Sequence, residues 1–138
     1  MYFIVSLSTT IKSLLENASA KALATNGPEG INVVPVSMIR VNSDSIWLFD
    51  FFMNKTKNNL AADGQVALAA WTDMTGVQIK AEVTYLSAGA EFEEAAAWVE
   101  TQNPERVTKG LLVLKPTAIY DVCPSGVFSE EDLACPKE

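Results

Sequence analysis

The chain has 138 residues, of which seventeen are acidic and ten are basic, so its formal net charge is −7. This length suits one domain over residues 1–138, and an apolar share of 49% excludes a disordered chain. The acidic balance excludes a surface for nucleic acid or an anionic membrane, because phosphates are bound by lysines and arginines in number.

The first residues do not resemble a targeting segment. MYFIVSL is apolar, but it has no basic leader and runs at once into a polar turn, so we do not interpret it as a signal peptide. No apolar run approaches the roughly 20 residues of a membrane span. We therefore expect a cytoplasmic protein with no membrane partner.

Histidine does not occur in the sequence, and this excludes several kinds of site. Ser-His and Cys-His nucleophile pairs, histidine metal sites and histidine-ligated haem all need that side chain. Cys123 and Cys135 could form a disulfide on count alone, but a cytoplasmic setting favours free thiols. We predict no metal site, so any redox chemistry would belong to a bound cofactor.

The first half of the chain shows a helix, a hairpin and a third strand. The helix is predicted over residues 8–18, where apolar residues share one face and Ser8 is the candidate N-cap. The turn residues NGPEG lie between ALAT and INVVPVSMIRV, which predicts a β-hairpin. The turn NSDS then leads into the strand IWLFDFF, and a short helix is expected from Asn54.

The second half adds three strands and a helix. QVALAAW is followed by the loop TDMTG and by VQIKAEVTYL, in which apolar and polar residues alternate. The helix AEFEEAAAWVETQ comes next, and GLLVLKPTAIYDV is the sixth strand. Six strands with three short helices predict a mainly β (α+β) fold, a six-stranded antiparallel barrel with flanking helices. The tail, residues 125–138, has no pattern that predicts a structure.

The second strand of the predicted hairpin has two unusual properties. INVVPVSMI is apolar at successive positions, so both of its faces should be covered. Pro35 cannot donate to a β-ladder and is tolerated only at an edge, a bulge or an opening. A barrel split open along this strand, with a ligand or a second subunit in the opening, fits both properties. An ordinary edge strand with a bulge fits them equally well.

Two lysines stand where the short second helix begins. If Asn54 caps this helix, Lys55, Thr56 and Lys57 occupy its first turn, where the helix dipole and free N–H groups already favour negative charge. A bound phosphate would offset the cations, using the N–H groups, the Thr56 hydroxyl and the lysines. A solvated and poorly optimised helix start is the alternative.

The order of these segments resembles a known family. GINVVPVSMIRV, IWLFDFFMNKTKNNL, QVALAAW, GVQIKAEVTYL and KGLLVLKPTAIYDVCP are similar to the pyridoxamine 5′-phosphate oxidase-like, FMN-binding split-barrel family, and most of all to its small bacterial and archaeal members. The resemblance spans roughly residues 10–124. It implies a split barrel that forms a homodimer, with FMN in a groove between the two subunits.

The resemblance also implies positions for the cofactor. One strand would run beside the isoalloxazine ring, the end of the next would flank the ring and ribityl chain, and the helix start would hold the phosphate. For Asp50, the alternative to a contact with the flavin ring is a local capping or hydrogen-bonding role. The implied cofactor-binding residues are Val34, Pro35, Val36, Ser37, Phe49, Asp50, Phe51, Asn54, Lys55, Thr56, Lys57 and Gln78.

Departures from the family limit the implied activity. Pyridoxamine phosphate oxidases carry a basic and aromatic C-terminal extension, whereas this chain ends in the acidic GVFSEEDLACPKE. A second phosphorylated substrate would be repelled there, so we do not expect a true pyridoxamine phosphate oxidase.

No side chain is an obvious general acid or base, and the catalytic residues stay unassigned. We expect an FMN-dependent oxidoreductase or electron carrier. A non-catalytic module for a flavin or phosphorylated ligand, and a deazaflavin-dependent reductase, are the alternatives.

Overall fold

The computed structural model describes residues 5–124 and 126–134. In these residues, seven strands form one antiparallel sheet in the order β2-β1-β5-β6-β7-β4-β3, accompanied by three helices. The elements in chain order are α1 (Thr9–Asn17), β1 (Ala20–Thr25), β2 (Asn32–Pro35), β3 (Ile39–Val41), β4 (Ile46–Asp50), α2 (Lys55–Ala62), β5 (Gln65–Thr72), β6 (Thr75–Leu86), α3 (Ala90–Gln102) and β7 (Gly110–Asp121).

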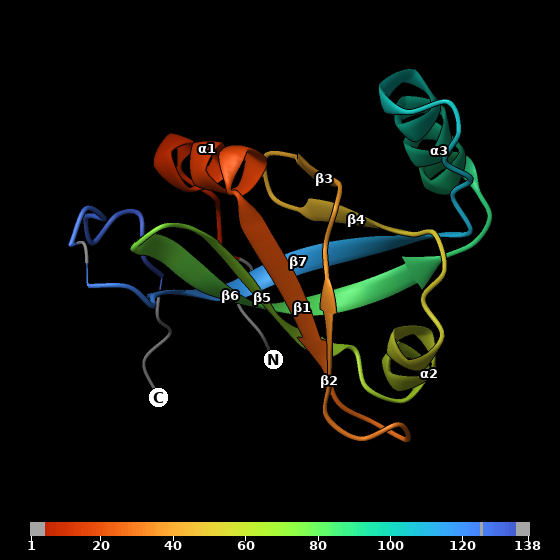
Figure 1. Cartoon of the computed structure of the whole chain (residues 1–138), viewed down its shortest axis with the longest axis horizontal. Helices are drawn as coiled ribbons and strands as arrows, with labels where there is room; N and C mark the ends of the chain where they lie inside the picture. The colour runs from red at the N-terminus through yellow and green to blue at the C-terminus, as the bar shows by residue number, and fades with distance from the viewer. Residues whose placement is uncertain (1–4, 125, 135–138) are drawn as a thin grey trace.

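The sheet is curled, so that β1 and β2 run across the direction of the long strands β6 and β7 (Figure 1). Its concave face encloses the main core, to which α1 contributes Ile11 and Leu15 and the strands contribute Leu23, Leu68 and Ile79. A second, smaller core lies where α3 packs on β4 and β7. The predicted mainly β split barrel with flanking helices is therefore confirmed.

The structure has one strand more than the six that the sequence predicts. The segment INVVPVSMIRV is not continuous, because β2 ends at Pro35 and β3 begins at Ile39. The two pieces lie at opposite edges of the sheet. Proline lacks the N–H that would donate to a ladder. After a last hydrogen bond from the Val36 N–H to the Lys21 carbonyl, the chain leaves the sheet and crosses to the other edge.

In the single chain, one face of this segment is open to solvent, and its cover by a ligand or a second subunit stays a prediction. Side chains alternate across β2, and the outward ones are open to solvent: Val33 is 61% exposed, and Ile31 just before the strand is 85% exposed. Val34 points to the inner side and packs against the main core. Pro35 lies on an edge strand, as expected.

The helices follow the sequence pattern closely. Ser8 caps α1 by accepting a hydrogen bond from the Ile11 N–H at 3.2 Å. In α3, Ala95 and Val99 are buried and Phe92 packs beside them, which confirms the predicted inner face. None of the helices in the described part of the chain has the length and apolarity that a bilayer crossing requires.

Two boundaries differ from the expectation. The strand predicted over IWLFDFF, which is β4, ends at Asp50, so Phe51 and Phe52 belong to the following loop. The predicted loop TDMTG is shorter in the structure, because β5 ends at Thr72 and β6 begins at Thr75. The turn between them consists of Asp73 and Met74, and Asp73 has a positive φ of 51°. Aspartate tolerates that conformation better than most residues, because its short side chain can hydrogen-bond locally.

The described part of the tail, residues 126–134, packs against the barrel. Phe128 and Leu133 contact the main core, and the Ala134 carbonyl accepts a hydrogen bond from the Ile119 N–H. Asp132 accepts a hydrogen bond from the Ser8 hydroxyl at 2.7 Å. The tail thus closes the end of the barrel where α1 begins. Cys123 is a free thiol, and Cys135 lies outside the described residues.

Candidate functional site

A cavity of about 580 Å³ opens between the β2 edge and the end of β4. Six of the residues implied by the family resemblance line it together: Val34, Pro35, Val36, Ser37, Phe49 and Phe51. The rest of the wall is formed by Met38, Phe52, Met53, Glu105, Arg106 and Val107. The wall is mostly aliphatic and aromatic, which is typical of sites for planar organic ligands.

The cavity follows from the break after Pro35. Residues 36–38 connect β2 to β3. The Val36 N–H still donates to the Lys21 carbonyl of β1 at 2.9 Å, and Ser37 and Met38 belong to no strand. The loop after β4 supplies Phe51 and Phe52, and the loop between α3 and β7 supplies residues 105–107. The opening in the barrel is thus bordered by three segments that are far apart in the sequence.

The start of α2 adjoins this cavity, because Met53 lines it and the helix begins at Lys55. Lys55 and Lys57 are exposed. Asn54 is the N-cap residue, so Lys55, Thr56 and Lys57 occupy the first turn as expected. Its backbone is helical, and its side chain makes no capping hydrogen bond. The first-turn N–H groups of an α-helix have no intrahelical partner, so they are available to an anion.

Thr56 and Asn59 hold α2 against the β1–β2 hairpin. Thr56 is 1% exposed, and its hydroxyl accepts a hydrogen bond from the Asn32 amide at 3.0 Å. The buried Asn59 amide donates to the Gly30 carbonyl at 2.9 Å and accepts from the Glu29 N–H at 2.9 Å. The Thr56 side chain therefore has a structural contact, and the exposed cations of this turn are Lys55 and Lys57.

Asp50 stands in the chain between the cavity-lining residues Phe49 and Phe51 and is 2% exposed. Its carboxylate accepts hydrogen bonds of 2.6 Å from the Met53 N–H and from the Tyr85 hydroxyl. Burial, together with this carboxylate, raises the pKa of Tyr85 well above its usual range. Asp50 thus has the local hydrogen-bonding role given as its alternative, and it organises the turn that leads into α2.

Gln78 does not join the other implied residues. It lies on β6 between Ala69 of β5 and Tyr120 of β7, on the face of the sheet opposite to Val77 and Ile79. Its side chain lines none of the three described cavities. Within one chain, Gln78 is therefore separate from the candidate site.

Arg106 is the functional candidate that the sequence analysis missed. Its guanidinium lies 4.7 Å from the centre of the Phe51 ring and donates to the Ser37 hydroxyl at 3.4 Å. It therefore connects two sides of the cavity. The segment NPERVTKG has turn composition and no periodic pattern, so only its place in the sequence, between α3 and β7, could have drawn attention to it.

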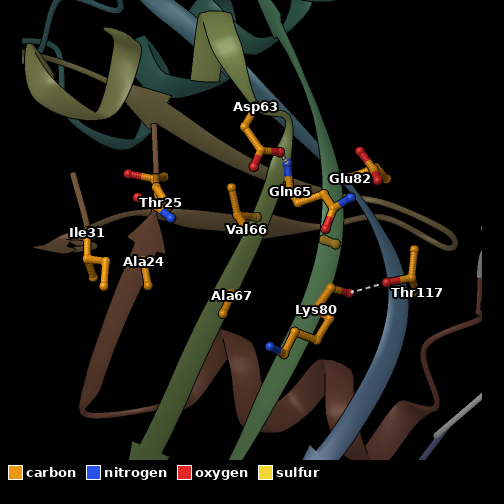
Figure 2. A pocket seen from close by; sticks show the side chains of 12 residues that line it. Ala24, Thr25, Ile31, Asp63, Gln65, Val66, Ala67, Lys80, Glu82 and Thr117 are labelled. Carbon is orange, nitrogen blue, oxygen red and sulfur yellow. Dashed lines mark hydrogen bonds between the residues drawn. The ribbon is translucent and has the colours of Figure 1, made fainter. Parts of the chain in front are cut away.

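A shallower pocket of about 320 Å³ lies on the outer face of the sheet, over β1, β5 and β6. Figure 2 shows Ala24, Ala67 and Lys80 across it, with the Thr117 hydroxyl donating to the Lys80 carbonyl at 3.2 Å. It contains none of the implied cofactor residues. Ala24 and Ala67 are small side chains and fill little of this pocket.

Comparison with solved structures finds the same fold in proteins of different function. HupZ of Group A Streptococcus has a TM-score of 0.76 at 19% identity, covering 86% of this chain and 95% of that one. An FMN-binding protein from Syntrophomonas wolfei has a TM-score of 0.69 at 23% identity, covering 80% and 82%. An F420 reductase has a TM-score of 0.61 at 17% identity, covering 79% and 94%.

The sequence matches none of the curated proteins with which it was compared. The family model described as pyridoxamine 5′-phosphate oxidase matches residues 7–123, which include every strand and helix of the described residues. The chain therefore belongs to the pyridoxamine 5′-phosphate oxidase family.

Proposed function

We propose that this protein binds FMN in the cavity between β2 and β4 and acts as a flavin-dependent oxidoreductase or electron carrier. The observation that carries this proposal is the arrangement of one apolar cavity beside one cationic helix start. Val34, Val36 and Phe49 offer apolar contacts. Met53 lines the cavity wall, and Lys55 and Lys57 stand in the first turn of the helix that begins two residues after it.

The residues present fit FMN and fit haem poorly. The apolar walls suit a tricyclic ring, while two ammonium groups and a helix N-terminus suit a phosphate dianion. Haem ligation by histidine is not available in this sequence. Bound FMN would supply hydride or one-electron chemistry, and the residues of this chain would bind the ring, orient it and exclude water.

We further propose a homodimer formed through the outer face of the sheet. Adjacent outward positions on β1 and β5 are alanines, paired as Ala22 with Ala69 and Ala24 with Ala67. Beside them, Val33 is 61% exposed and Trp71 is 37% exposed. A flat apolar face of this kind is typical of subunit contacts. In a twofold dimer formed through this face, the Gln78 side chain would point toward the partner subunit.

The phosphate assignment can be tested by comparing FMN with riboflavin, which lacks the phosphate. Replacing both Lys55 and Lys57 with alanine should weaken FMN binding by about tenfold or more, since charge-assisted hydrogen bonds contribute about 1.5–3 kcal/mol. Riboflavin binding should change by less than about twofold. Flavin fluorescence quenching and calorimetry measure both affinities.

Thr56→Ala is the structural control for that experiment. It removes the contact with Asn32 and should weaken FMN and riboflavin together, because it loosens α2 instead of removing a phosphate ligand. Equal losses of both flavins in the double lysine variant would contradict the phosphate site at the helix start.

A deazaflavin is the second candidate cofactor, and the structural similarity to an F420 reductase favours testing it. Titration of the purified protein with FMN and with F420 separates the two. Bleaching of the bound flavin by a reduced nicotinamide would support a reductase, and its persistence would support a passive flavin-binding module. A cytoplasmic setting, with free thiols at both cysteines, belongs to the same proposal.

A further inference from the structure

We infer that the cavity between α1, β3 and α3 binds the oxyanion group of a second substrate, a phosphate monoester or a carboxylate, through Arg40 and Arg106. This inference rests on the proposed function, because that substrate would react at the flavin next to it. The cavity has a volume of about 690 Å³ and is lined by both of the arginines in the chain.

Arg40 is held in place by aromatic rings. Its guanidinium carbon lies 4.9 Å from the ring centre of Trp47 and 5.5 Å from that of Trp98. Trp98 is itself stacked on Phe49 at 5.5 Å. Stacking fixes the plane of the guanidinium and leaves its N–H groups, which lie at the edge of that plane, available for a bidentate ligand.

Arg106 is held in the same manner, over the Phe51 ring. Within residues 5–124 and 126–134, neither arginine has a carboxylate within ion-pair distance, and the ion pair found there joins Lys12 to Glu16. Two rigid cations without counter-ions are unusual in a chain with a net charge of −7. Their arrangement favours an anionic ligand from outside the chain.

The charges around the cavity agree with this interpretation. Lys21 and the two arginines line it, against one carboxylate, Glu16, which gives 3 − 1 = +2. Lys21 already donates to the Ala18 carbonyl at the end of α1, at 3.2 Å. Glu16 is paired with Lys12 at 3.9 Å. The arginines therefore have no carboxylate partner among the described residues, although Arg106 also donates to the Ser37 hydroxyl.

The two cavities share part of their walls. Ser37, Met38 and Arg106 line both of them. A molecule whose oxyanion lies at the arginines could therefore extend past Ser37 toward the candidate flavin cavity. The described tail, residues 126–134, lines neither cavity.

The test uses the flavin-free full chain with glycerol 2-phosphate and succinate as probes, at low ionic strength. Calorimetry and tryptophan fluorescence report binding, since Trp98 lines the cavity and Trp47 contacts Arg40. We expect saturable binding of at least one probe, and the tighter one identifies the oxyanion as a phosphate monoester or a carboxylate. Arg40→Gln and Arg106→Gln should each weaken it by about tenfold or more.

Lys115→Gln is the matched control, because it removes one positive charge from β7 outside the three cavities. It should change the affinity by less than about twofold. Absence of saturable binding in the wild type, or equal losses in all three variants, would overturn the inference. If Arg40→Gln does not fold, Arg106→Gln and Arg106→Lys decide, with a smaller loss expected for lysine because it keeps the charge but not the fork.

FMN binding by the same wild-type sample keeps the two proposals distinguishable. Oxyanion binding without FMN binding would reject the flavin assignment and retain the arginine site. FMN binding without oxyanion binding would retain the flavin assignment and reject the arginine site. Lys115 lines none of the three cavities, so Lys115→Gln should leave riboflavin affinity unchanged within about twofold.

Discussion

Asp50 connects the end of β4 to the helix that follows it through its two hydrogen bonds, to the Met53 N–H and the Tyr85 hydroxyl. Lys57 adds a cation 5.5 Å from the Tyr85 ring centre. Gly110 packs directly against the Tyr85 hydroxyl, where a Cβ atom would clash. These residues fix the position of α2, and with it the position of the two candidate phosphate-binding lysines.

Removal of the tyrosine hydroxyl tests this network. Tyr85→Phe should lower the free energy of unfolding by about 1–3 kcal/mol, because a buried carboxylate oxygen loses its donor. Because the folded pKa of Tyr85 is raised, the unfolded chain loses this proton first, so wild-type stability should fall as the pH rises above about 10. Urea unfolding across alkaline pH measures both effects.

Tyr85→Phe should not show the fall in the free energy of unfolding at alkaline pH that the ionisation of Tyr85 causes in the wild type. Tyr120→Phe is the control, since Tyr120 is 37% exposed on the outer face, and it should follow the wild type within about 0.5 kcal/mol. Parallel pH curves for the wild type and Tyr85→Phe would show that the Asp50 contact does not govern the proton of Tyr85.

At the scale of the elements, α1 is completed by the tail. The Ser8 hydroxyl caps the helix and also donates to Asp132, whose other oxygen accepts from the Ser129 N–H at 3.0 Å. The hydrogen bond from Ser8 is the main cause of a lowered pKa of Asp132. A carboxylate near a helix N-terminus is also favoured by the helix dipole.

Acid titration should reveal this contact between the tail and the helix. A lowered pKa of Asp132 gives stability that is present above the unfolded value of about 3.9 and is lost as the pH falls through the folded value. Asp132→Asn should therefore have a lower Tm than the wild type at neutral pH, and the two should converge in acid. Glu131→Gln, at an exposed neighbouring position, should match the wild type throughout.

At the scale of the whole molecule, the two faces of the curled sheet have different roles. The inner face is filled by leucine, isoleucine and valine side chains, whereas the outer face of β1 and β5 consists mainly of alanine. The inner face therefore makes the core of one chain. The outer face is proposed to meet a second copy.

Ala69→Arg places a charge in the centre of the proposed subunit contact. Sedimentation should show a dimer for the wild type and a monomer for this variant, because a buried unpaired charge at an interface is strongly unfavourable. Ala97→Arg, on the exposed side of α3, should remain dimeric. A wild-type monomer that binds FMN tightly would contradict the shared groove.

The sequence by itself determined the elements whose local signals agree with one another. Ser8 with its apolar helix face, the alternation from Val77 to Tyr85 and the sidedness of α3 all appear as predicted. The order of motifs also indicated the family, and six of the twelve cofactor-binding residues that it implied line one cavity. Such signals are readable because caps and side-chain periods depend on residues close in the chain.

The tertiary structure decided everything that depends on contacts between distant segments. Whether Thr56 faces solvent or Asn32, and whether Asp50 meets Tyr85, depends on the packing of α2 against strands far away in the sequence. The two arginines are 66 residues apart (106 − 40 = 66) and share a cavity because β3 and α3 converge there. No local pattern encodes that convergence, because long-range packing places side chains by the burial of the whole chain.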